Sequence, residues 1–245
     1  MAKRSSRAAQ AHRRDGTVES LFGPGWHPLG EGDGDREQSY RRKVRPQSDN
    51  QRRFMAAIES HSLTLALGPA GTGKTYLAIT AAIEALEAGR VGRIVLTRPA
   101  IEAGESLGFL PGDMHDKLAP YLRPLYDALN ERIGGKRVRQ LIAEGAIEIA
   151  PVAYMRGRTL NNAFIVIDEA QNCTYVQIKM LLTRLGWHST MVLTGDPDQS
   201  DLLEGLSGLS DIARRLEAVP EVAVIRLDDS DIVRHPLVAG MLTVL

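Results

Sequence analysis

The chain has 245 residues, of which 43% are hydrophobic and 24% charged, a composition typical of a globular protein with one large or two small domains. No stretch approaches about 18 uninterrupted apolar residues, which argues against a membrane-spanning helix and a membrane partner. The basic start of the chain is not followed by an apolar segment, which argues against a secretory signal. A single cysteine, Cys173, cannot form an internal disulfide, and we therefore expect a cytoplasmic protein.

The net charge is zero, but it is unevenly distributed along the chain. Residues 1–48 hold ten Lys and Arg against six Asp and Glu, which leaves the rest with a net charge of −4. Charge alone therefore does not predict strong non-specific binding of nucleic acid, although the basic end could contact phosphates. Residues 1–47 are poor in regularly spaced apolar residues, so we expect a disordered basic tail ahead of a folded domain over 48–245.

From Ser48 onward, short apolar stretches alternate with longer amphipathic ones. Gly89 should end the second helix, whereas Pro120 and Pro124 should break or kink the third. Short apolar strands separated by helices predict βαβ units, and hence an α/β fold with a mostly parallel sheet and helices on both faces. We expect helices over 48–60, 74–89, 112–134, 136–145, 174–186 and 206–219, and strands over 63–67, 93–97, 146–150, 163–167, 190–194 and 222–227.

A glycine-rich turn, GPAGTGKT, joins the first strand to the next helix. It fits the pattern G-x-x-x-x-G-K-[ST] of a phosphate-binding loop (P-loop), in the strand–turn–helix context that the pattern requires. Glycines let the backbone amides form a concave nest for phosphate oxygens, and the start of the helix adds its positive end. The alternative is a plain glycine-rich turn. We predict an ATP site formed by Gly68, Pro69, Ala70, Gly71, Thr72, Gly73, Lys74 and Thr75, with Lys74 on the β- and γ-phosphates and the Thr75 hydroxyl on Mg²⁺.

Another apolar strand runs directly into Asp168 and Glu169. Ligands of open parallel sheets bind at the carboxyl ends of the strands, where these acids should lie beside the P-loop. Asp168 would hold Mg²⁺, directly or through water, and Glu169 would orient and deprotonate the attacking water. The alternative is a solvated acidic pair at the start of the next helix.

A third strand ends in the polar sequence TGDPDQ. Gln199 could reach the γ-phosphate or the attacking water, and Gln171, in DEAQ, could do the same. The alternative for the first of these segments is a simple Asp-Pro-Asp turn.

With these pieces together, the chain from Ser48 to its C-terminus resembles the PhoH-like ATPases. The resemblance rests on GPAGTGKTYLA, TRPAIEAGESLGFLPGD, AYMRGRTL placed before IVIDEAQN, GDPDQSDL and DIVRHPL. That family is similar to the first motor domain of superfamily-one helicases. The resemblance implies a RecA-like P-loop NTPase fold, Mg²⁺-dependent ATP hydrolysis, a link to RNA and, for many members, to phosphate starvation.

By the same resemblance, Gln51 matches a glutamine that contacts adenine, and the loop after Arg98 matches one that contacts a nucleic-acid backbone. Superfamily-one helicases bind ATP between two such domains, the second of which supplies an arginine to the γ-phosphate. About one domain remains here beyond the tail, so we expect identical subunits to complete one another's sites in a ring, as a hexamer. Candidates for this arginine, or for RNA contacts, are Arg156, Arg158 and Arg234, with surface ion pairs as the alternative for each of the three. Arg98 is a further candidate for RNA contacts or for this role.

The sequence thus favours an Mg²⁺-dependent ATPase coupled to RNA binding or helicase-like remodelling. Two alternatives stay open: a small-molecule kinase built on the same P-loop, and a nucleotide-gated regulatory protein without motor activity.

Overall fold

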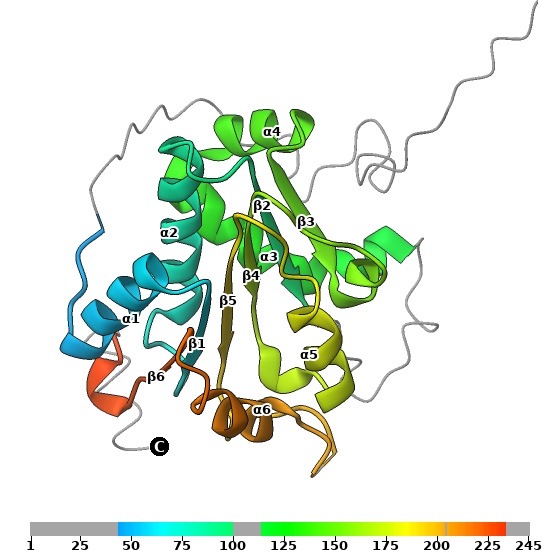
Figure 1. The fold of residues 1–245 in the computed structure, drawn as a ribbon. Coiled ribbons are helices and arrows are strands. Elements are labelled where there is room, and N and C mark those ends of the chain that lie inside the picture. The colour runs from blue at the N-terminus through cyan, green and yellow to red at the C-terminus, as the bar shows by residue number, and fades with distance from the viewer. Residues whose placement is uncertain (1–43, 100–113, 204, 234–245) are drawn as a thin grey trace, which may run out of the picture.

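The computed structural model describes residues 44–99, 114–203 and 205–233. Six strands form one parallel sheet in the order β3-β2-β4-β5-β1-β6 (Figure 1). The central strands are buried along almost their whole length, as expected for a sheet covered on both faces. The strands are β1 (Leu63–Leu67), β2 (Arg93–Arg98), β3 (Ile147–Pro151), β4 (Ala163–Ile167), β5 (Thr190–Gly195) and β6 (Val222–Arg226).

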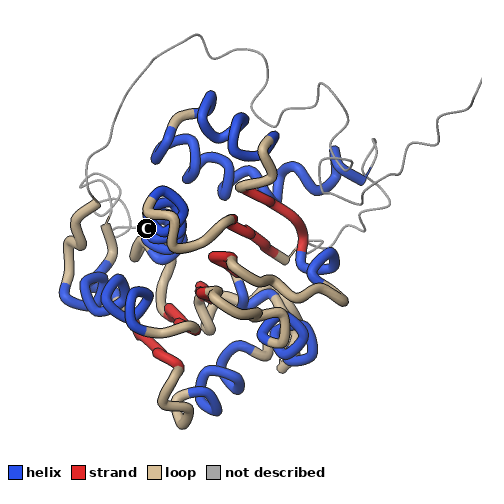
Figure 2. The backbone as a smooth tube through the Cα atoms, turned by 45° about the horizontal axis from the view of Figure 1, so that its top comes forward, coloured by secondary structure: helices blue, strands red, loops and turns tan. Residues whose placement is uncertain are grey.

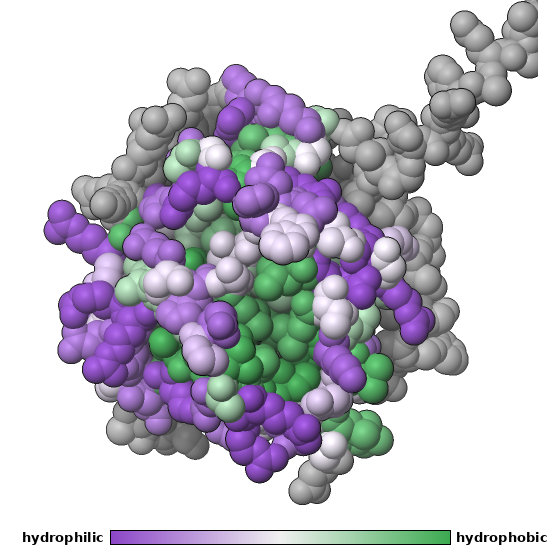
Figure 3. All heavy atoms as spheres, viewed as in Figure 1, coloured by the Kyte–Doolittle hydropathy of each residue, from purple (hydrophilic) through white to green (hydrophobic). Residues whose placement is uncertain are grey.

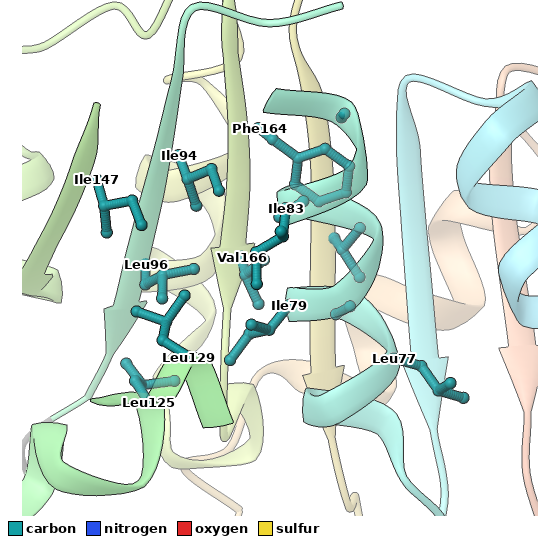
Figure 4. Packing of buried hydrophobic residues seen from close by; sticks show 14 of the residues in the cluster. Leu77, Ile79, Ile83, Ile94, Leu96, Leu125, Leu129, Ile147, Phe164 and Val166 are labelled. Carbon is teal, nitrogen blue, oxygen red and sulfur yellow. The ribbon is translucent and has the colours of Figure 1, made fainter. Parts of the chain in front are cut away.

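Four helices cover one face of the sheet: α1 (Asp49–Ser60), α2 (Lys74–Glu87), α3 (Met114–Ile133) and α4 (Gly135–Ala143). Helix α1 packs over β1 and β6, α2 over β4 and β5, and α3 over β2 and β3. Figure 4 shows Ile79 and Ile83 of α2 facing apolar residues of β2 and β4, with Leu125 and Leu129 of α3 beside them. This packing fixes the start of α2, which follows the P-loop.

Helices α5 (Tyr175–Leu182) and α6 (Leu209–Leu216) pack on the opposite face, together with the short 3₁₀ segment η3 (Val152–Met155). The smoothed backbone shows helices on both sides of the strands (Figure 2). Apolar side chains gather near the centre of the face drawn in Figure 3, within a rim of polar and charged residues. Two further 3₁₀ turns, η4 (Ala170–Asn172) and η5 (Asp229–Asp231), follow β4 and β6.

Three expectations about the helices are corrected by the structure. Helix α3 continues through Pro120 and Pro124 without the expected break, because Leu122, Leu125 and Leu129 on the same helix are buried in the core, and the kink given as the other outcome stays a prediction. Helix α5 ends at Leu182 instead of 186, since the backbone of 184–186 bonds to Leu160. Helix α6 starts at Leu209 instead of 206, where the preceding glycine lies against the backbone of Tyr175.

The predicted α/β architecture is confirmed. Because all strands are parallel, the segments after β1, β2, β4 and β5 meet at one edge of the sheet. β5 separates the strand before the P-loop from the strand before the acidic pair. The fold is a six-stranded parallel α/β sheet with the strand–loop–helix unit of the P-loop pattern inside it. The expected tail lies outside the described residues up to position 43, and the domain boundary expected between residues 47 and 48 stays a prediction.

Candidate active site

The loop between β1 and α2 has the backbone conformation that only glycine adopts readily. Gly68, Gly71 and Gly73 have φ angles of 143°, 86° and 81°. A Cβ atom on Gly68 would lie 2.2 Å from the carbonyl oxygen of Leu227, just beyond β6, so a side chain cannot fit there. The glycines of the P-loop pattern are therefore needed for both the curvature and the close approach to β6.

Lys74 is buried at the start of α2 and turns back over the loop. Its Nζ atom donates hydrogen bonds to the carbonyl oxygens of Gly68, at 2.6 Å, and Pro69, at 2.7 Å. Burial lowers the pKa of Lys74 below its ordinary value, while the nearby carboxylates of Asp196, Glu169 and Asp168 oppose this shift. A poorly solvated ammonium held by carbonyl oxygens gains much from contact with an anion, as a phosphate would provide.

Asp168 directly follows β4 and is almost fully buried. Its Oδ1 atom accepts hydrogen bonds from the hydroxyls of Thr75, at 2.5 Å, and Thr194, at 2.7 Å. Thr194 belongs to β5, so three segments that are distant in sequence meet at one carboxylate oxygen. The predicted Thr75–Asp168 pair is thus in direct contact.

Glu169 has a left-handed backbone conformation, with φ of 53°, which directs the chain from β4 into η4. Gln171 donates from Nε2 to Glu169 Oε2 at 2.5 Å, and its Oε1 accepts from the backbone N–H of Asp196 at 3.1 Å. Gln171 therefore connects Glu169 to the turn after β5. Sequence analysis had instead expected Gln171 to reach the γ-phosphate or the attacking water.

Arg98 ends β2 and lies beside both acids. Its guanidinium is 3.4 Å from Asp168 Oδ2 and 3.5 Å from Glu169 Oε1. Of the four arginine candidates, it is the one that the described part of the chain brings to the acidic pair.

A family model described as "PhoH-like protein" matches residues 43–245. The chain belongs to the PhoH-like protein family. It is 52% identical to the PhoH-like protein of Bacillus subtilis (strain 168) over 202 residues, which are 82% of this chain and 63% of that protein. It is 47% identical to Protein PhoH of Escherichia coli (strain K12) over 193 residues, 78% of this chain and 54% of that protein. The chain thus spans between half and two thirds of the length of these relatives.

Solved structures resemble this PhoH-like chain only distantly. They include the Pif1 helicase from Candida albicans, with a TM-score of 0.39 and 15% identity over 76% of this chain and 41% of that one. Another is the Sulfolobus solfataricus SWI2/SNF2 ATPase core in complex with dsDNA, with a TM-score of 0.43 and 16% identity over 73% of this chain and 35% of that one. No functional statement follows from these likenesses.

The remaining predicted residues are placed as follows. Gln51 is buried against the P-loop, where its Nε2 donates to the carbonyl oxygen of Thr72 at 3.1 Å and its Oε1 accepts from the N–H of Gln47 at 2.7 Å. Its contact with adenine stays a prediction. Gln199 lies in the turn after β5 with an exposed side chain, and its N–H donates to the carbonyl oxygen of Asp196 at 3.2 Å.

The two arginines after β3 differ in their surroundings. Arg158 forms a two-pronged ion pair with Glu148, one arm of which measures 2.7 Å, and this hydrogen bonding raises the pKa of Arg158. Arg156 is exposed at the end of η3. Arg234 lies outside the described residues.

The oxygen donors of the site fit Mg²⁺, because Thr75 and Asp168 present hard oxygen atoms side by side. Within the described ranges, no group of three or more His, Cys, Asp or Glu side chains is arranged to hold a metal ion. A magnesium ion here would thus need further oxygens, which nucleotide phosphates supply.

Sequence analysis missed Thr194 and Asp196 as parts of this site. Asp196 is buried, and its Oδ1 accepts from the N–H of Asp198 at 3.1 Å. The signal was present in the polar residues TGD at the end of the β5 strand, but their partners could be known only from the strand order.

No helix in the described ranges combines the length and apolar character needed to cross a bilayer.

Proposed function

We propose that this chain binds Mg²⁺·ATP at the P-loop and hydrolyses it. The observation that carries the proposal is the meeting of Lys74, Thr75, Asp168 and Glu169 at one edge of the sheet, where the P-loop ends. Phosphoryl transfer needs alignment and charge neutralisation more than covalent chemistry, and this set of groups provides both.

In the proposed mechanism, the P-loop amides and the start of α2 bind the β- and γ-phosphates. Lys74 exchanges its loop carbonyls for phosphate oxygens and neutralises their charge. Mg²⁺, held by Thr75 and Asp168, would supply electrostatic stabilisation of the phosphates when bound. Glu169, oriented by Gln171, accepts the proton of the attacking water.

We further propose that ATP hydrolysis is coupled to RNA binding and takes place in the cytoplasm, where ATP and RNA are both present. Family resemblance and the basic residues before position 48 support the link to RNA. The described residues form a single RecA-like unit, which supports a homo-oligomeric ring, a hexamer, in which an arginine of one copy completes the site of the next. The candidates are Arg156, which is exposed, and Arg234, which lies outside the described residues, since Arg158 is engaged by Glu148.

The test is phosphate release from Mg²⁺·ATP without any added acceptor, compared between the wild type, Lys74→Ala and a control, Lys179→Ala, whose lysine is exposed on α5. We expect steady release from the wild type and the control, and loss of ATP binding or turnover in Lys74→Ala, because Lys74 is buried against the P-loop and Lys179 is not. Equal activity of all three proteins would refute the site.

The same assay separates the alternatives. A kinase would transfer the γ-phosphoryl group to an acceptor and release little free phosphate in an assay without one, and a nucleotide-gated regulator would bind ATP but turn it over very slowly. Repeating the measurement with and without single-stranded RNA, beside the mass of the assembly, tests the RNA and ring proposals. No stimulation by RNA would leave an ATPase without the proposed coupling.

A further inference from the structure

Arg98 forms ion pairs with both acids of the site. β2 and β4 are neighbours, and Thr97 is in register with Ile167. The residues that follow these two, Arg98 and Asp168, therefore lie side by side at the edge of the sheet. The guanidinium lies 3.4 Å from Asp168 Oδ2 and 3.5 Å from Glu169 Oε1. The Arg98 side chain is only 23% exposed, so this charge is partly shielded from water.

With these contacts, every oxygen of both carboxylates has a partner among the described residues. Asp168 Oδ1 receives the hydroxyls of Thr75 and Thr194, which leaves Oδ2 for Arg98. Glu169 Oε2 receives Gln171, which leaves Oε1 for Arg98. One planar guanidinium therefore fixes the relative placement of the two acids, a geometry that the single ammonium of lysine cannot reproduce.

The positive charge of Arg98 beside Asp168 makes the binding of another cation to that carboxylate less favourable. Lys74 lies near the same acids, but its Nζ is bonded to carbonyl oxygens of the loop. A divalent cation that approaches Asp168 meets the charge of a guanidinium already paired with that carboxylate, and partial burial limits the screening between them.

We propose that Arg98 is a positioning residue that holds Asp168 and Glu169 together and competes with the divalent cation for Asp168. The inference rests on the proposed function, in which Asp168 serves Mg²⁺·ATP. Cation binding without nucleotide is weak because few oxygen ligands are present in the described part of the chain and because Arg98 opposes it further. When the cation arrives with ATP, Arg98 gives up Asp168 and keeps Glu169 aligned for attack by water.

The test measures Mn²⁺ binding to the nucleotide-free protein by electron paramagnetic resonance, and so does not depend on turnover. We expect Arg98→Gln to bind Mn²⁺ about tenfold more tightly than the wild type, because a competing charge has been removed. The control is Arg93→Gln at the opposite end of β2, roughly 16 Å away along the strand, which should bind Mn²⁺ as the wild type does.

A second measurement follows single-turnover phosphate release at saturating Mg²⁺·ATP. Arg98→Gln should release phosphate at least about tenfold more slowly while still binding a fluorescent ATP analogue, because Glu169 loses its second partner. Arg98→Lys should keep the wild-type Mn²⁺ affinity yet recover the rate only in part, and it provides the answer if Arg98→Gln does not fold.

Unchanged or weaker Mn²⁺ binding by Arg98→Gln would overturn the inference, and so would full turnover by either Arg98 variant. A wild-type protein that fails to bind ATP would instead contradict the proposed function, which the analogue-binding measurement detects separately.

Discussion

Glu169 illustrates how a single carboxylate is fixed at the site. Gln171 bonds one of its oxygens at 2.5 Å, Arg98 lies 3.5 Å from the other, and the backbone at this residue is left-handed. A water-activating group needs such orientation because a misplaced base loses much of its effect.

We therefore expect Glu169→Gln to lower kcat by at least about a hundredfold, the usual contribution of a general base. The amide keeps the shape of the side chain, so ATP binding should be retained. The measurement is phosphate release together with equilibrium binding of an ATP analogue. A variant with near-normal kcat would exclude Glu169 as the base, and loss of analogue binding would indicate a role in binding instead.

Two buried threonines at the same edge of the sheet, Thr194 and Thr97, allow a controlled comparison of two variants. The Thr194 hydroxyl donates to Asp168, whereas the Thr97 hydroxyl has no hydrogen-bond partner among the described residues. Valine preserves the shape of threonine, so substitution removes only the hydroxyl.

Thr194→Val should raise the Mg²⁺ concentration needed for half-maximal turnover by roughly fivefold, the effect of losing one hydrogen bond of about 1 kcal/mol to a metal carboxylate. Thr97→Val should leave that concentration unchanged and leave stability equal or higher. Magnesium titrations and thermal unfolding check both variants. Equal titration curves for the two variants would remove Thr194 from the metal site.

At the level of elements, α1 and η5 support the P-loop from the side of β6. Buried Asp231 in η5 accepts from Asn50 of α1 at 2.9 Å and from the N–H of Asp228 at 2.8 Å. The N–H of Val233 then donates to the carbonyl oxygen of Gly71 in the P-loop at 3.0 Å. The end of the described chain is thus joined to the nucleotide loop.

This connection should depend on pH. Burial by itself would raise the pKa of Asp231, but hydrogen bonds from Ser48, Asp228 and Asn50 outweigh burial and lower it. A lowered pKa means that stability is present above the ordinary value, about 4, and is lost as the pH falls through the folded-state value.

Asp231→Asn should reduce the free energy of unfolding by about 1–3 kcal/mol at neutral pH, because charged hydrogen bonds are lost. The difference from the wild type should shrink as the pH falls below about 4. Urea unfolding at several pH values provides the measurement. A constant difference across that range would show that the charge of Asp231 does not contribute.

At the level of the whole molecule, the carboxyl edge of the sheet gathers the P-loop, the two acids and Arg98 from three strands, β1, β4 and β2. Exposed Arg156 follows β3 at the same edge, at the far end of the sheet from β6. This arrangement leaves an arginine free to reach a neighbouring copy in the proposed ring.

If copies complete one another's sites, specific activity should rise steeply with protein concentration over the range in which the assembly forms. An arginine acting between subunits contributes about 10³-fold or more in related phosphoryl-transfer enzymes. ATPase assays across a dilution series, paired with mass photometry, test this expectation. Full activity in a dilute monomer would remove the ring model.

Much of the fold and part of the site could be predicted from local sequence signals. Apolar stretches gave the six strands to within a residue or two, and GPAGTGKT predicted the loop before α2. The prolines of α3 do not break the helix, because burial of Leu125 and Leu129 outweighs the local backbone preference of proline. The ends of α5 and α6 were missed for a similar reason, since contacts between distant segments stop both helices.

The sequence by itself determined the parallel sheet, the P-loop and the acids Asp168 and Glu169, because each depends on neighbours within one short segment. Only the tertiary structure decided that Thr194 bonds Asp168, that Gln171 holds Glu169, and that Arg98 pairs with both acids. The physical reason is that strand order and register bring these groups together, and both result from packing across the whole sheet.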